Sequence, residues 1–119
     1  MENCIFCKII KREIPSKIIF EDEKVIAFND IQPEAPIHVL VVPKIHIESI
    51  YDVNINNANI LIDIHLTANI VAKQLGISDS GFRLITNCGI DAGQMVKHLH
   101  YHLLGGKKLN AKLMNNCNI

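Results

Sequence analysis

Residues 95–104 read MVKHLHYHLL and place three of the chain's six histidines at alternate positions. A β-strand points successive side chains to opposite faces, so this segment predicts a strand with His98, His100 and His102 on one face and the intervening leucine and tyrosine on the other. Neighbouring imidazoles would then lie about 7 Å apart along the strand. Crowded imidazoles favour the neutral form, which acts as nucleophile, proton carrier or metal ligand. A single histidine is usually an ordinary core or surface residue, whereas three on one face predict a functional site.

Hydrophobic spacing on the N-terminal side of this strand predicts the rest of the fold. Apolar residues recur at steps of three or four before Gly76, which is suited to end a helix. We expect a short helix over 4–12, strands over 17–21, 24–30, 37–43 and 81–87, and a long helix over 56–76. One long helix between the third and fourth of five strands indicates an α+β fold with a five-stranded antiparallel sheet. The whole chain, 1–119, is expected to be a single domain with a patternless tail over 107–119.

Composition excludes several classes of protein. Twelve Lys and Arg balance twelve Asp and Glu, so there is no basic excess to attract nucleic acid. No apolar run approaches the roughly 20 residues that span a bilayer, and the first residues do not resemble a signal peptide. We therefore expect a cytoplasmic protein with no membrane or nucleic-acid partner, whose four cysteines are reduced.

The loop before the histidine strand indicates an anion. GIDAGQ, residues 89–94, contains two glycines, and glycines allow backbone N–H groups to approach and surround a phosphate. Alone, such a loop more often means a tight turn. Beside three aligned imidazoles it predicts chemistry at phosphorus.

The segment HLHYHLL is similar to the signature of the histidine triad (HIT) family, His-x-His-x-His-x-x with x often apolar. The resemblance extends along the chain, through CIFCKIIKREIPSKIIFEDEKVIAFNDIQPEAPIHVLVVPKIH, GFRLITN, DAGQ and HLHYHLLGGK, which resemble successive blocks of the nucleoside phosphoramidase branch. It implies a HIT-like fold, a homodimer whose two sheets join into one, and a purine nucleotide site on each subunit.

Catalytic roles follow from the resemblance position by position. His100, the middle histidine, matches the family nucleophile, which forms a nucleotidyl-imidazole intermediate that water hydrolyses to a nucleoside monophosphate. His102 matches the residue that contacts phosphate oxygens, His98 is the first triad histidine, and His38 matches a fourth histidine behind the triad. Residue chemistry agrees, since a neutral imidazole is both a nucleophile and a tolerable leaving group near neutral pH.

Nucleotide contacts are also implied by the resemblance. Asp30 matches a carboxylate that accepts the two ribose hydroxyls, although it could instead be a turn residue before Pro33. The phosphate-site residues are Asn87, Gly93, Gln94 and Met95, together with His102. The purine-pocket residues are Ile5, Phe6, Ile9, Asn29 and Ile31, although apolar residues of this kind more often form core. Met95 departs from the family pattern, because many members of the branch have serine or another polar residue there, which contacts the phosphoramidate nitrogen or the phosphate.

Cys4 and Cys7 have the spacing of metal ligands. Two intervening residues let both thiolates reach one tetrahedral Zn²⁺, and the rival interpretation, a redox pair, would require a thioredoxin-like context that this sequence lacks. Some family members with this motif complete a Cys₂His₂ zinc site, and the resemblance implies that His46 and His98 complete it here. Four protein ligands would make that zinc structural.

Three functions are compatible with the sequence. The leading hypothesis is a hydrolase of purine nucleoside 5′-phosphoramidates or acyl-adenylates that acts through His100. The second is a dinucleoside polyphosphate hydrolase, which the N-terminal CxxC block and the short chain disfavour. The third is a nucleotide-binding or scaffold protein whose catalysis is incidental, and only an assay separates it from the first.

Overall fold

A single antiparallel sheet organises residues 3–110, the part of the chain that the computed structural model describes. Its strands lie in the order β1-β2-β3-β5-β4, and every neighbouring pair is antiparallel. The strands are β1 (Ile18–Glu21), β2 (Val25–Asn29), β3 (Ile37–Pro43), β4 (Phe82–Ile85) and β5 (Tyr101–Gly105). The expected α+β fold with five antiparallel strands is confirmed.

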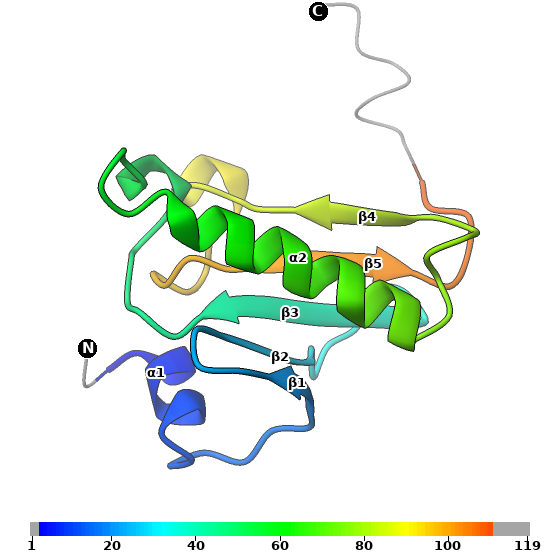
Figure 1. The fold of residues 1–119 in the computed structure, drawn as a ribbon, viewed down its shortest axis with the longest axis horizontal. Coiled ribbons are helices and arrows are strands. Elements are labelled where there is room, and N and C mark those ends of the chain that lie inside the picture. The colour runs from blue at the N-terminus through cyan, green and yellow to red at the C-terminus, as the bar shows by residue number, and fades with distance from the viewer. Residues whose placement is uncertain (1–2, 111–119) are drawn as a thin grey trace, which may run out of the picture.

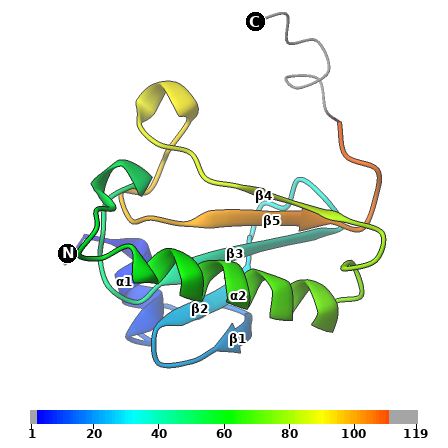
Figure 2. The same ribbon diagram turned by 45° about the horizontal axis from the view of Figure 1, so that its top comes forward.

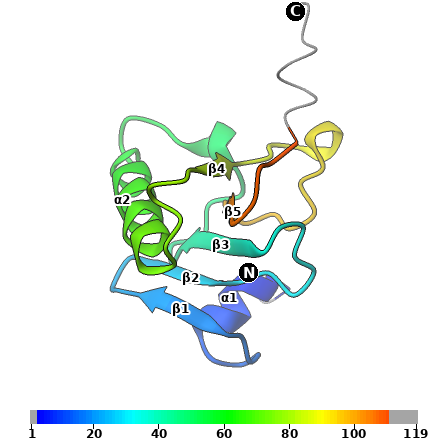
Figure 3. The ribbon, with the colours of Figure 1, turned by 90° about the vertical axis from the view of Figure 1, so that its right-hand side faces the viewer.

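Two helices cover opposite faces of the sheet. The long helix α2 (Asn59–Gln74) crosses one face (Figure 1), and the short helix α1 (Ile5–Ile10) lies on the other, as the side view shows (Figure 3). The loop that carries the turn η2 (Ile90–Ala92) projects from the sheet on the side away from α2 (Figure 2), and a second short turn, η1 (Ile50–Asp52), lies between β3 and α2 along the chain. Among the described residues, no helix is long and apolar enough to cross a membrane.

Both faces of the central strands are buried because side chains alternate between two cores. On the α2 side, Val39, Val41 and Leu103 pack with helix residues such as Ile64. On the α1 side, Leu40 packs with a second group that consists of Phe6, Ile9, Ile26, Phe28 and Val42. The even-numbered positions of β3 therefore face α1, as do the even-numbered histidines.

The histidine strand is shorter than predicted. We expected a strand over 95–104, but β5 begins at Tyr101, and residues 95–100 form no strand. The opposite strand explains this, since the register that pairs Val41 with Tyr101 would next bring Pro43 to Leu99, and proline has no N–H to donate. The N–H of Leu99 donates instead to the carbonyl of Ile47, at 2.6 Å. The predicted alternation of side chains is nevertheless kept, because Leu99, Tyr101 and Leu103 all enter the α2-side core.

The long helix is also shorter than expected at its start. It begins at Asn59 rather than at Asn56, because asparagine side chains before it hydrogen-bond to the local backbone. The Asn57 side chain accepts from Asn54 N–H at 2.7 Å, and the Asn54 side chain accepts from Asn56 N–H at 2.8 Å. Such local bonds compete with helix formation. The helix ends as predicted, with Gly76 just beyond it at φ 77°.

Candidate functional site

His100 lies at the centre of the site with one ring nitrogen fixed by the main chain. Its Nδ1 is 2.7 Å from the carbonyl oxygen of His98, and a carbonyl can only accept, so Nδ1 carries the proton. The other nitrogen, Nε2, therefore keeps its lone pair. The ring is buried, with the edge-to-face ring of Phe6 5.0 Å away between centroids, and burial lowers the pKa of His100. The result is a neutral imidazole with a nucleophilic Nε2.

His102 and His38 form a second pair of imidazoles on neighbouring strands. The β3–β5 register pairs His38 with Leu104 and Leu40 with His102, so the two histidines are diagonal neighbours on one face. His38 Nε2 lies 2.9 Å from His102 Nδ1, and the ring centroids of His102 and His100 are 5.2 Å apart. Burial, followed by the nearby His100 and His38, lowers the pKa of His102. Three of the histidines predicted to share a site are therefore in ring contact.

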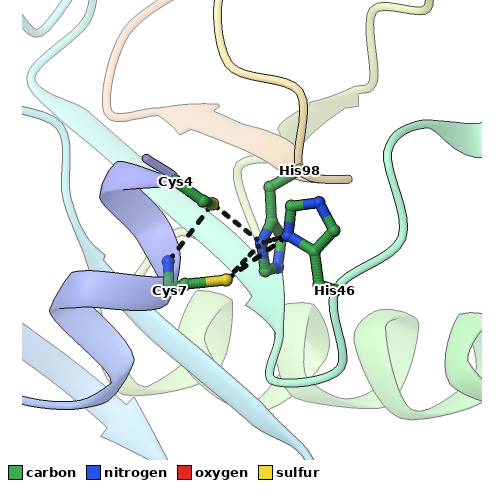
Figure 4. Close-up of side chains that lie close together, drawn as sticks. All are labelled: Cys4, Cys7, His46 and His98. Atoms are coloured by element: carbon green, nitrogen blue, oxygen red, sulfur yellow. Dashed lines mark hydrogen bonds between the residues drawn. The ribbon is translucent and has the colours of Figure 1, made fainter. Parts of the chain in front are cut away.

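His98 links this site to a second group of side chains. Its Nε2 lies 2.8 Å from the carbonyl oxygen of Pro43, so Nε2 is the protonated nitrogen and Nδ1 has the lone pair. That Nδ1 faces the Cys/His cluster, which consists of Cys4, Cys7, His46 and His98 (Figure 4). Burial is the largest cause that lowers the pKa of His98 to about 4, so the imidazole is neutral near pH 7.

The Cys/His cluster has the dimensions of a tetrahedral zinc site. The two Nδ1 atoms of His46 and His98 are 3.1 Å apart, and three S···N distances are 3.3, 3.3 and 3.6 Å. A Zn²⁺ ion with ordinary bond lengths would need edges of about 3.3 Å between two nitrogens and about 3.5 Å between nitrogen and sulfur. Burial, followed by the neighbouring Cys4 thiol, raises the pKa of Cys7, and a bound cation would favour the thiolate again. Two thiols and two imidazoles suit zinc by chemistry as well as by spacing.

Helix α1 brings the two cysteines into this arrangement. Cys4 is the residue that caps the helix, and its Sγ accepts from the N–H of Cys7 at 3.3 Å. In Figure 4 both sulfur atoms point from the helix toward the two imidazoles. A CxxC pair in the first turn of a helix therefore meets a loop after β3 and the segment before β5.

Asp30 lies at the rim of the site and is already partly engaged. One carboxylate oxygen accepts from Gln32 N–H at 2.9 Å, and the other lies 3.3 Å from His38 Nε2. Asp30 therefore takes part in a turn, as the simpler interpretation held, and it also faces the histidines. Of the apolar residues predicted to form a purine pocket, Phe6 and Ile9 are buried on the α1 side, whereas Ile5 and Ile31 are exposed, and Asn29 is half-buried.

The loop after β4 is held by Gln94 rather than by glycine alone. Its side-chain oxygen accepts from Gly89 N–H at 2.9 Å, and its side-chain nitrogen lies 2.6 Å from the carbonyl oxygen of Glu48 and 3.0 Å from that of Val96. Gly93 has φ 87°, which is typical of glycine. Gln94 therefore connects three backbone segments, and a role toward phosphate was its only predicted one.

Other residues of the predicted set lie along the same loop. Asn87 is half-buried, and Met95 is 90% exposed, outside any strand. A cavity of about 340 Å³ is lined by Met95, by Ile5 at the start of α1 and by Glu48, and it also borders Cys4 and His46 of the Cys/His cluster. Cys88 is an exposed free thiol, and Cys117 and the last residues of the predicted tail, 111–119, lie outside the described residues.

Two contacts at the histidines were not predicted. The hydroxyl of Thr86 donates to the carbonyl of His100 at 2.9 Å, and the ring of Phe6 packs against both His98 and His100. Both depend on long-range packing. Only the position of Thr86 within the strand expected over 81–87, the element that precedes the histidine strand along the chain, could have indicated the first.

Comparisons with known proteins agree with this arrangement. Residues 3–117 match a protein-family model described as "Scavenger mRNA decapping enzyme C-term binding". A purine nucleoside phosphoramidase of Escherichia coli (strain K12) is 46% identical over 112 residues, which are 94% of this chain and 94% of that protein. A 14 kDa zinc-binding protein of Brassica juncea is 44% identical over 110 residues, which are 91% of this chain and 96% of that protein. A solved HIT family hydrolase from Clostridium thermocellum superposes with a TM-score of 0.93 at 61% identity, and the match covers 96% of this chain and 99% of that one.

The neutral imidazoles predict that acid destabilises the fold. Because the pKa values of His98, His100 and His102 are lowered in the folded protein, the unfolded chain binds more protons between the ordinary histidine pKa of 6.5 and about 4. The free energy of unfolding should therefore fall as the pH falls through this window. Urea denaturation at a series of pH values, with a chelator present, measures the slope. His102→Asn removes one such group and should decline less steeply, whereas equal slopes would contradict the prediction.

Proposed function

Because the chain belongs to the histidine triad (HIT) family, we propose that it hydrolyses purine nucleoside 5′-phosphoramidates or acyl-adenylates and releases the nucleoside monophosphate. The observation that carries the proposal is the hydrogen bond from His100 Nδ1–H to the His98 carbonyl. This bond leaves Nε2 unprotonated, with its lone pair available for attack. The identity of 46% to a protein named purine nucleoside phosphoramidase supports this choice of substrate.

The reaction uses two substitutions at phosphorus. His100 Nε2 attacks the α-phosphorus, the P–N bond of the phosphoramidate breaks, and the nitrogen leaves as an amine after it is protonated. Water then attacks the nucleotidyl-imidazole, the N–P bond breaks, and His100 and the nucleoside monophosphate are released. Covalent catalysis replaces one difficult step with two easier ones, and burial keeps the nucleophile neutral, as the lowered pKa of His100 indicates.

Neighbouring residues bind the nucleotide. His102 donates a hydrogen bond to a phosphate oxygen and stabilises the developing negative charge, since such charge-assisted bonds are strong. The free lone pairs of Asp30 accept the two ribose hydroxyls, while α1 and Ile31 contact the purine. Gln94 shapes the phosphate loop through its three main-chain contacts.

Rapid-quench experiments with a labelled adenosine phosphoramidate should trap an acid-labile adduct on His100. His100→Ala should lose nearly all turnover, because the pocket remains but the nucleophile is gone, and it should still bind adenosine monophosphate. Mass spectrometry of peptides from the quenched protein locates the adduct.

Matched substrates sharpen this test. Diadenosine polyphosphates assayed beside the phosphoramidate show whether the leaving group is an amine or a nucleotide. An adduct on His98 or His102, or faster turnover of the polyphosphates, would contradict the proposed chemistry. Binding without any turnover would mean that the protein only binds nucleotides.

We also propose that the Cys/His cluster holds a structural zinc ion. Its four donor atoms all lie within 4.8 Å of one another, and four protein ligands leave no position for a water molecule. The ion would tie the N-terminal helix to the segment before β5. Thiolate ligands need a reducing compartment, so this proposal includes a cytoplasmic location.

Protein purified without a histidine tag should contain about one zinc ion per chain. Cys4→Ser with Cys7→Ser should abolish the metal, whereas Cys88→Ser, which changes an exposed thiol outside the cluster, should retain it. Elemental analysis makes the comparison. Chelation should lower the melting temperature clearly while it changes the turnover rate little, because closed zinc sites contribute folding free energy. Zinc that persists in the double variant would rule out this assignment.

We further propose that this chain forms a homodimer. Ile62, Leu66 and Ile70 repeat every four residues on α2 and are 58%, 56% and 47% exposed, which makes an apolar stripe. Strand β4 is an outer strand of the sheet, so its free backbone groups can pair with another strand. Together these features support a homodimer in which the two sheets join.

A charge in the stripe should break this dimer. Leu66→Glu is expected to sediment as a monomer, because an unpaired carboxylate would be buried at the interface. Ile45→Glu is the matched control, since Ile45 is equally exposed at 57% but lies in the loop after β3, near the β1–β2 turn. Analytical ultracentrifugation at micromolar concentration measures both. A monomeric wild type, or a Leu66→Glu variant that remains dimeric, would contradict the model of joined sheets.

A further inference from the structure

His38 is a buried histidine on β3 whose two ring nitrogens both have partners. Its Nδ1 accepts a hydrogen bond from the backbone N–H of Glu34, at 3.0 Å. Its Nε2 lies 2.9 Å from His102 Nδ1 and 3.3 Å from a carboxylate oxygen of Asp30. The ring therefore stands between a main-chain donor and the third histidine of the triad.

The main-chain donor determines where the proton of His38 lies. A backbone N–H can only donate, so Nδ1 must present its lone pair, and the single proton of a neutral imidazole is then on Nε2. Protonation of His38 Nδ1 would place two hydrogens between that nitrogen and the backbone nitrogen of Glu34. Asp30 favours the same form, since a carboxylate oxygen beside Nε2 is an acceptor.

The proton on His38 in turn determines the form of His102. Because His38 Nε2–H donates, His102 Nδ1 must accept, and the proton of neutral His102 is left on Nε2. His100 has the opposite form, with its proton on Nδ1, although the two rings are only 5.2 Å apart between centroids. Adjacent imidazoles are thus set to opposite tasks, one as a nucleophile and one as a hydrogen-bond donor.

We propose that His38 is a positioning residue that relays the polarity of the Glu34 amide to His102 and does not itself transfer protons. It holds His102 with Nε2–H directed outward, ready to donate to a phosphate oxygen. The loop over 30–36 supports the relay, because Asp30 N–H also donates to the His38 carbonyl at 3.0 Å. The catalytic consequence of the relay rests on the proposed function, whereas the direction of the hydrogen bond does not.

Nitrogen NMR tests the direction of the bond without any assay of turnover. In protein whose histidine rings are labelled with ¹⁵N, near neutral pH, the proton shared by His38 and His102 should show its one-bond coupling to His38 Nε2. His102 Nδ1 should have the shift of an unprotonated nitrogen, and His102 Nε2 that of a protonated one. A proton bonded to His102 Nδ1, or a His38 ring protonated on both nitrogens, would overturn the proposal.

Two variants then separate relay from proton transfer. His38→Gln supplies one acceptor and one donor but cannot titrate, so it should keep His102 protonated on Nε2 and lose less than about tenfold in kcat/KM. His38→Leu removes both hydrogen bonds, so it should give His102 a mixture of forms and lose on the order of a hundredfold or more. If His38 acted as an acid or base, the glutamine variant would be as slow as the leucine variant, which would overturn the relay.

The two proposals fail in different ways. If the wild type hydrolyses no phosphoramidate while the NMR spectra show the expected forms, the proposed function is wrong and the relay stands. If turnover is normal and the shared proton belongs to His102, the relay is wrong and the function stands. Should His38→Leu fail to fold, the wild-type spectra and the glutamine variant decide the question.

Discussion

The hydrogen bond from His100 Nδ1–H to the carbonyl of His98 is the contact on which the rest of the site depends. It leaves Nε2 of His100 unprotonated, with a free lone pair, and it requires the backbone at His98 to be held in one conformation. That conformation is maintained because the side chain of His98 donates to the Pro43 carbonyl on one side and faces the cysteines on the other. One residue therefore belongs to the proposed metal site through its ring and to the nucleophile through its backbone.

The early end of the β3–β5 ladder makes this arrangement possible. If the ladder continued past Val41 and Tyr101, the carbonyl of Pro43 would be available to β5 and the N–H of Leu99 would pair with β3. Instead, Leu99 pairs with Ile47, which brings the loop carrying His46 against His98. The site thus forms where strand pairing stops, while side-chain alternation continues through it and keeps the histidines on the α1 face.

Much of this could be predicted from sequence, because periodicity and residue chemistry are local. Residue spacing predicted the five strands, the two helices and the alternation of side chains through the histidine strand. The resemblance to HIT proteins supplied the four residues of the Cys/His cluster. The predicted start of β5 was wrong, because the pattern of one strand does not show where the neighbouring strand contains a proline. The bonds of His38 were not predictable, since its strand register and the path of the loop at Glu34 are long-range properties. Gln94 likewise gave no sign that its amide would connect three backbone segments.

The groups that determine which ring nitrogen of His38, His98 and His100 is protonated have a consequence for how this protein can change over evolution. They are the carbonyls of residues 43 and 98 and the amide of residue 34, and they belong to the backbone. Every amino acid supplies a carbonyl, so these two acceptors do not by themselves restrict the residue type, and position 43 is restricted only because a residue with an N–H there could extend the ladder. At position 34 only proline is excluded, because it lacks the N–H. An alignment of homologous sequences would therefore show little constraint at position 34, although two histidines take their orientation from its amide.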